Sequence, residues 1–101
     1  MNRIIPEHCN SLEEVRQGID RIDEEIIRLI GERGRFVKKA ATFKTNPDAV
    51  RDEKRVAAVI DSKKQLAVKN GVAPELAAEI YTAMIGYFIR EEMEYCKADN
   101  S

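Results

Sequence analysis

The feature that most constrains this chain is an uninterrupted amphipathic segment that begins at Ser11. Ser11 and Glu14 form the pattern of a capping box, in which the serine accepts from the Glu14 amide while the glutamate reaches back. No proline or strong turn signal follows before Asn46 and Pro47. Apolar residues recur at steps of three and four, at Leu12, Val15, Ile19, Ile22, Ile26, Leu29, Phe36 and Ala40. The pattern predicts one helix of about 30 residues, about 45 Å long.

A helix of this length is too long for the rest of the chain to cover. It is about three times the average helix of a globular protein, whereas the whole chain has 101 residues. A chain of this size buries a limited share of its surface when it folds alone. We therefore expect part of the apolar stripe to contact a partner chain.

Two further helices are expected after this segment. Residues 45–48 predict a loop, because a proline disfavours helix at the residue before it. The second helix is expected from about Val50 to Lys69, and the third from Pro74 to about Ala98. The sequence thus predicts an all-α fold with three helices (long, short, medium). We expect a single domain over residues 1–101, with flexible ends at 1–10 and 98–101.

Composition excludes several classes of function. The chain has 17 basic and 18 acidic residues, and this balance argues against nucleic acid as a partner. Residues 1–6 lack the apolar run of a signal peptide, and no stretch is long enough to span a membrane. We therefore expect a cytoplasmic protein without membrane contact, with Cys9 and Cys96 as reduced thiols. His8 and two scattered cysteines make no metal-ligand set, so neither metal nor cofactor is expected.

Two charged residues occupy positions where the helical pattern calls for apolar ones. Arg33 lies four residues after Leu29 in the first helix, and Glu92 lies three residues after Ile89 in the third. A buried charge is costly unless a partner or a ligand compensates it. Two interpretations remain open: the side chains bind a ligand, or they are partly exposed or pair with each other across the bundle.

Three other cations extend this pattern. Lys44 follows Arg33 by eleven residues, nearly on the same face if the helix persists, and Arg55 adjoins the apolar side of the second helix. Arg16 precedes Arg33 by 17 residues, which is about 25 Å along a helix axis. Arg16 and Arg33 of one chain therefore cannot hold the same small ligand. Arg16 is either a solvated residue or a contribution from a second, antiparallel chain.

Several cations with one carboxyl group suit a small dianionic ligand. Arginine binds carboxylates in a bidentate manner, and lysine supplies a point charge. The sequence contains no recognisable nucleophile with an adjacent base and no glycine-rich phosphate loop. Any chemistry at this site would therefore proceed without a covalent intermediate, through positioning and electrostatic stabilisation.

These residues resemble the all-helical chorismate mutase family. The likeness is carried by Val15-Arg16-Gln17-Gly18-Ile19-Asp20-Arg21-Ile22-Asp23, Gly31-Glu32-Arg33, Val37-Lys38 and Phe43-Lys44. Within the family, the chain is most similar to the isochorismate-pyruvate lyases of salicylate and siderophore biosynthesis. Cys9 and Arg55-Val56-Ala57-Ala58 also look lyase-like.

The resemblance implies an intertwined homodimer with two active sites and no cofactor. Arg16 would reach into the partner's site, and the lysine would lie on or beside a loop that closes over the ligand. The residues implied as catalytic are Lys44, Glu92 and Arg33. Those implied as substrate-binding are Arg16, Arg33, Lys44, Arg55, Asp52, Val56 and Ile89.

Two positions depart from patterns within the family. The lyases usually carry glutamine at the position of Glu92, and a glutamate can donate a hydrogen bond only when it is protonated. Some mutases have a glutamate at the position of Val56 that binds the C4 hydroxyl of chorismate, and valine cannot accept that bond. We expect an isochorismate pyruvate lyase with side chorismate mutase activity. The alternatives are chorismate mutase as the main activity, or a non-catalytic helical dimerisation or regulatory module.

Overall fold

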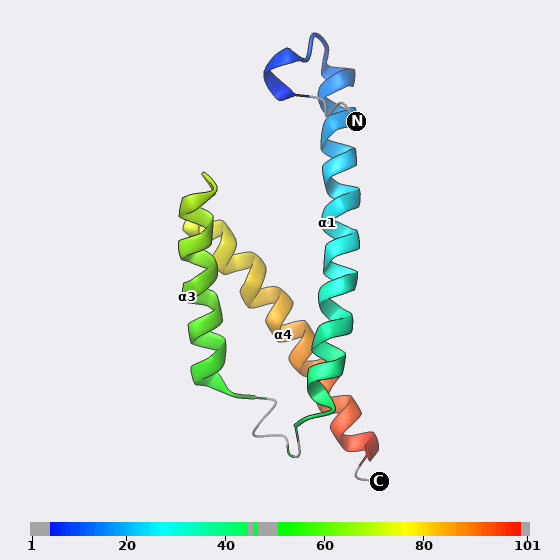
Figure 1. Cartoon of the computed structure of the whole chain (residues 1–101), viewed down its shortest axis with the longest axis vertical. Helices are drawn as coiled ribbons and strands as arrows, with labels where there is room; N and C mark the ends of the chain where they lie inside the picture. Colours follow the sequence, from blue (N-terminus) through cyan, green and yellow to red (C-terminus); the bar gives the residue numbers. More distant parts are fainter. Residues whose placement is uncertain (1–4, 45, 47–50, 100–101) are drawn as a thin grey trace. The chain divides into compact units, whose positions relative to one another are not determined.

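The computed structural model describes residues 5–44, 46 and 51–99, with side chains described as far as Glu94. These residues form three α-helices and a short 3-10 helix (Figure 1), namely η1 (Pro6–His8), α1 (Leu12–Ala41), α3 (Glu53–Lys69) and α4 (Pro74–Asp99). The helices contain 30, 17 and 26 residues, so the all-α prediction with its long, short and medium helices is confirmed. Within this described part, no helix has the length and apolar character that crossing a membrane requires.

The chain divides into two compact units, residues 1–36 and 37–101, with the boundary inside α1. In the first unit, Ser11 begins α1. Its Oγ accepts from the backbone N–H of Glu14 at 3.1 Å, as predicted. The Glu14 carboxylate reaches back to the N–H of Asn10, also at 3.1 Å, and so bonds one residue before the cap. Two N–H groups that the helix cannot satisfy are thereby paired.

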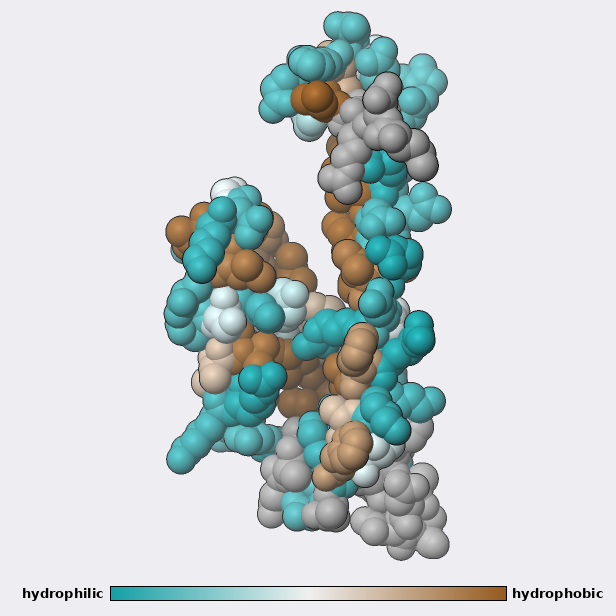
Figure 2. Space-filling view, viewed as in Figure 1, coloured by the Kyte–Doolittle hydropathy of each residue, from teal (hydrophilic) through white to brown (hydrophobic). Residues whose placement is uncertain are grey.

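The apolar stripe of α1 is exposed in the single chain. Figure 2 shows apolar side chains as a column along one side of α1, with hydrophilic side chains beside it. A pocket of about 350 Å³ opens onto the same stripe, between the segment that carries Pro6 and Cys9 and the α1 residues Val15 and Ile19. The stripe residues between 39% and 71% exposed are Leu12, Val15, Ile19, Ile22, Ile26, Leu29 and Phe36. A continuous apolar surface of this kind is typical of an interaction site.

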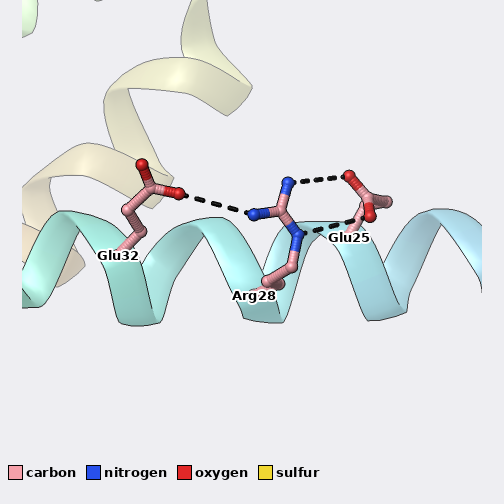
Figure 3. Close-up of polar contacts among 3 residues, drawn as sticks. All are labelled: Glu25, Arg28 and Glu32. Carbon is pink, nitrogen blue, oxygen red and sulfur yellow. Dashed lines mark hydrogen bonds and ion pairs between the residues drawn. The ribbon is translucent and has the colours of Figure 1, made fainter.

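A different side of α1 carries a charged network that faces solvent (Figure 3). Arg28 donates through Nη2 to Glu25 Oε2 at 3.1 Å, and through Nη1 to Glu32 Oε2 at 3.4 Å. The hydrogen bond and the charge of Glu25 raise the pKa of Arg28 above its ordinary value. The three side chains are about half exposed, so the network adds little to stability.

The second unit begins with the last residues of α1 and the turn that follows them. α1 ends at Ala41, and three successive backbone bonds from Thr42, Phe43 and Lys44 to carbonyls three residues earlier tighten the chain there. Because the helix does not persist to Lys44, the helix-face relation of Lys44 to Arg33 considered above does not apply. The backbone of Lys44 is instead held against the end of α1 by its bond to the Ala41 carbonyl at 3.2 Å.

α3 (Glu53–Lys69) begins three residues later than the start predicted at about Val50. Asp52 is the N-cap: its backbone is extended and its side chain accepts from the N–H of Arg55 at 3.1 Å. Aspartate is among the strongest N-cap residues because its short carboxylate pairs a free N–H of the first turn. The earlier part of the predicted helix, including Val50, lies outside the described residues.

The turn between α3 and α4 matches the stop predicted at Asn70 and Gly71. Gly71 has φ 70°, a left-handed conformation that glycine adopts without steric cost. The N–H of Val72 bonds to the Ala67 carbonyl at 2.8 Å, and that of Gly71 bonds to the Val68 carbonyl at 3.3 Å. This pair of bonds is a Schellman motif.

Small side chains lie where α3 packs against α4. Ala67 and Ala77 are the buried apolar residues of the described part, and their size lets the two backbones approach near the turn. Farther along, the Lys63 ammonium lies 5.7 Å from the centre of the Tyr81 ring, a cation–π contact. From the turn, α3 and α4 diverge toward their other ends (Figure 1).

Candidate functional site

A buried ion pair is the central feature of the second unit. Lys44 Nζ donates to Glu92 Oε2 at 2.9 Å. The Glu92 side chain is 7% exposed and the Lys44 side chain is 30% exposed. Glu92 is thus a charged group in the interior whose compensating cation comes from a segment 48 residues away. The pair connects the turn after α1 to the C-terminal half of α4.

Glu92 occupies an otherwise apolar position of α4. Ile89, one turn earlier, and Met93, which follows it, are half-buried. The sequence predicted that a charge at this position would need a partner or a ligand, and the structure supplies Lys44. An ammonium donor and a carboxylate acceptor are therefore held 2.9 Å apart, in surroundings where a polar interaction is stronger than in water.

Three predicted site residues lie at the first turn of α3. Asp52 caps the helix, Arg55 is exposed, and Val56 is half-buried. Counted back from Asn70, Arg55 lies about 22 Å from the α3–α4 turn. Glu92 lies about 27 Å beyond Pro74 along α4 by the same measure. Arg55 and Glu92 therefore both belong to the half of the helix pair that is remote from the turn.

The remaining predicted cations, Arg16 and Arg33, belong to α1 in the first unit. Arg16 is exposed and Arg33 is half-buried. Because α1 is continuous between them, they are separated by about 25 Å, as the sequence predicted. One small ligand cannot contact both in the same chain.

The sequence interpretation missed two relations in this region. The Lys44–Glu92 pair joins residues 48 apart, and no helical periodicity extends across the loop between them. The capping role of Asp52 was detectable, because an aspartate three residues before Arg55 is an N-cap signal. It was missed because the helix start was placed at Val50.

The arrangement of Lys44 and Glu92 is suited to holding an ether or carboxylate oxygen. An acceptor about 2.8 Å from both Nζ and Oε2 would satisfy both hydrogen-bond distances, provided that the glutamate carries a proton. Arg55 of α3 belongs to the same unit and is a further cation that can bind a carboxylate. The groups present can bind, orient and polarise a small anionic ether without forming a covalent bond to it.

Two comparisons relate this chain to known proteins. An isochorismate pyruvate lyase of Pseudomonas aeruginosa is 33% identical over 90 residues, which cover 89% of this chain and 89% of the relative. Residues 15–93, which include every predicted site residue, match the family described as chorismate mutase type II. The chain therefore belongs to the chorismate mutase type II family.

Proposed function

We propose that this protein is an isochorismate pyruvate lyase that also has weak chorismate mutase activity. The observation that carries the proposal is the buried Lys44–Glu92 pair, because it holds an ammonium donor beside a carboxyl group that becomes a second donor to an ether oxygen when it carries a proton. The similarity to the Pseudomonas aeruginosa lyase over most of both chains supports the choice of substrate.

The proposed reaction is a concerted pericyclic elimination. The bond between ring C3 and the ether oxygen breaks while the hydrogen on ring C2 passes to the methylene carbon of the enolpyruvyl group. The ring becomes aromatic as salicylate, and the enolpyruvyl group leaves as pyruvate. Atoms balance without water, a cofactor or a covalent enzyme intermediate. The protein needs to hold the side chain over the ring and stabilise negative charge on the departing oxygen.

Each cation has a separate role in this proposal. Lys44 donates to the ether oxygen, and protonated Glu92 donates to the same atom. Arg33 and Arg55 bind the two carboxylates of the substrate, together with Arg16 from a partner chain. Ile89 and Val56 form apolar walls that exclude water, which strengthens every polar interaction inside the site.

Val56 favours isochorismate over chorismate. The two substrates differ in the ring carbon that carries the hydroxyl group, C2 in isochorismate and C4 in chorismate. Valine offers no hydrogen-bond acceptor, so a C4 hydroxyl directed at this position would lose its bonds to water without replacement. An unpaired polar group of this kind costs about 1–3 kcal/mol.

Chorismate mutase as the main activity is the second candidate. It is favoured by Glu92, because the resemblance implies glutamine at this position in the lyases and glutamate in some mutases. The match of residues 15–93 to chorismate mutase type II also accommodates this activity. Both reactions are pericyclic and use the same dianion-binding groups, so the two candidates differ in ring contacts and not in the identity of the cations.

The proposed active unit is a homodimer in the cytoplasm. The seven large apolar residues of the α1 stripe are at least 39% exposed in the single chain, and an antiparallel second copy would cover them. In the same arrangement, Arg16 of the partner chain would lie near Arg33 of the first chain. The separation of about 25 Å between Arg16 and Arg33 of one chain would then no longer prevent two such residues from holding one ligand.

Separate incubation with each substrate tests the proposal. Purified protein is supplied with isochorismate or with chorismate, and salicylate fluorescence and prephenate formation are followed. Salicylate as the main product supports the lyase. Prephenate alone selects the mutase, and the absence of both products contradicts both enzymatic candidates.

A further inference from the structure

The Asp52 side chain accepts a hydrogen bond from the backbone of Arg55, three residues later in the chain. Its Oδ1 accepts from the Arg55 N–H at 3.1 Å, and its backbone carbonyl accepts from the Val56 N–H at 3.0 Å. Both bonds are made by one extended residue, with φ −83° and ψ 97°. Asp52 therefore holds the backbone of Arg55 and Val56, which are predicted substrate-binding residues of α3.

This bond matters because Arg55 lies on the first turn of its helix. The first N–H groups of a helix have no partner within it, and helix ends open more readily than helix centres. Arg55 is exposed, so neighbouring side chains hold it only partly. Loss of the cap would leave its guanidinium less often in the position from which it can bind an anion.

The charge of Asp52 argues against a direct contact with the substrate's carboxylates. A carboxylate close to a dianion is repelled by it, and the repulsion grows as water is excluded. Asp52 Oδ1 already accepts a hydrogen bond from the backbone N–H of Arg55. Asp52 can therefore benefit a dianion site through the helix start that it stabilises.

We propose that Asp52 is a positioning residue, whose carboxylate acts on the dianionic substrate through Arg55 and does not contact the substrate's carboxylates. The inference rests on the proposed function, since it requires that Arg55 binds the substrate. It assigns Asp52 a different role from the substrate contact that the family resemblance implies.

The test compares Asp52→Ser with Asp52→Ala. Both replacements are neutral and similar in size, but serine can cap a helix and alanine cannot. Steady-state kinetics are measured with isochorismate and chorismate, and circular dichroism checks that each variant is folded. We expect Asp52→Ala to raise KM about fivefold relative to Asp52→Ser, with kcat within twofold.

Asn70→Ala is the matched control at the other end of the same helix. Asn70 Nδ2 donates to the Leu66 carbonyl at 2.9 Å, so its removal also deletes an end-capping side-chain bond. We expect a lower urea midpoint with no change in KM. An equal KM rise in Asn70→Ala would overturn the proposal, because the effect would then follow from stability alone.

Two other results would also overturn the proposal. Equal KM values for Asp52→Ser and Asp52→Ala would show that the helix cap does not affect substrate binding. Restoration of wild-type KM by Asp52→Glu but not by Asp52→Ser would indicate that the carboxylate itself contacts the ligand. Failure of the proposed function is distinct from these, because the unaltered protein would then turn over neither substrate.

Discussion

Lys44 and Glu92 form an ion pair at 2.9 Å although 48 residues separate them in the chain. The pair attaches the turn that follows α1 to a buried position of α4, so one contact has both a structural and a chemical consequence. It ties together two segments of the second unit. It also places an ammonium group beside the carboxyl group that we propose as its catalytic companion.

The structural consequence can be measured with a double-mutant cycle. Lys44→Ala leaves the buried Glu92 without its cation, and we expect a loss of about 1–3 kcal/mol in the free energy of unfolding. Glu92→Ala removes the costly charge itself. The double variant should therefore be more stable than the sum of the single effects predicts. Urea unfolding at pH 7 provides the values, and strictly additive losses would show that the pair contributes no coupling energy.

The chemical consequence predicts a specific effect of replacing Glu92 by glutamine. The Glu92 carboxyl group can donate to the ether oxygen only when it carries a proton, whereas the ion pair with Lys44 uses its charged form. A glutamine amide donates without this competition, so Glu92→Gln should retain turnover of isochorismate and Glu92→Ala should lose about 100-fold. The measurement is kcat for both variants at one pH. Equal kcat values for the two variants would remove Glu92 from the mechanism.

The sharing of Arg16 between chains predicts complementation between two inactive variants. Arg16→Ala and Arg33→Ala should each lose about 100-fold or more in turnover while remaining dimeric. If Arg16 serves the partner's site, a mixed dimer holds one intact site. Equal mixing, after unfolding and refolding together, should then restore about a quarter of the wild-type activity.

The complementation experiment has a clear contrary outcome. No recovery in a preparation shown to contain mixed dimers would place Arg16 in the site of its own chain or outside the site. Arg28→Ala is the matched control on α1, because Arg28 contacts Glu25 and Glu32 on the solvent side. Its turnover should equal that of the wild type. If Arg33→Ala fails to fold, the residue is structural.

Two glycine-to-alanine replacements should change stability in opposite directions. Gly71 has φ 70°, which alanine adopts poorly, so Gly71→Ala should cost about 1 kcal/mol or more. Gly31 is inside α1, with nothing within 4 Å of the position that a Cβ would occupy. Gly31→Ala should therefore stabilise the protein by about 0.5–1 kcal/mol. Thermal or urea unfolding measures the stability change of each variant. A change of the same sign in both variants would contradict these expectations.

The helices were predictable because their signals are local. The Ser11 cap, the three-and-four spacing of α1 and the Asn70–Gly71 stop each depend on residues within a few positions of one another. The structure confirms all three. The start of α3 was misplaced because the apolar Val50 obscured the stronger capping signal of Asp52.

The site was predictable as a set of residue types and less so as a set of contacts. The charges at Arg33 and Glu92 stand out because they break an apolar pattern. The partner of Glu92 depends on how the chain returns after α1, and helix periodicity ends at Ala41. Long-range pairs of this kind follow from tertiary packing, which spacing alone does not encode.

A competition between the two substrates is the most decisive test of the proposed lyase activity. Equal concentrations of isochorismate and chorismate are supplied together to the purified protein, and salicylate and prephenate are measured at low conversion. The product ratio then equals the ratio of the two kcat/KM values. We expect salicylate to exceed prephenate. An excess of prephenate would contradict it and identify chorismate as the preferred substrate.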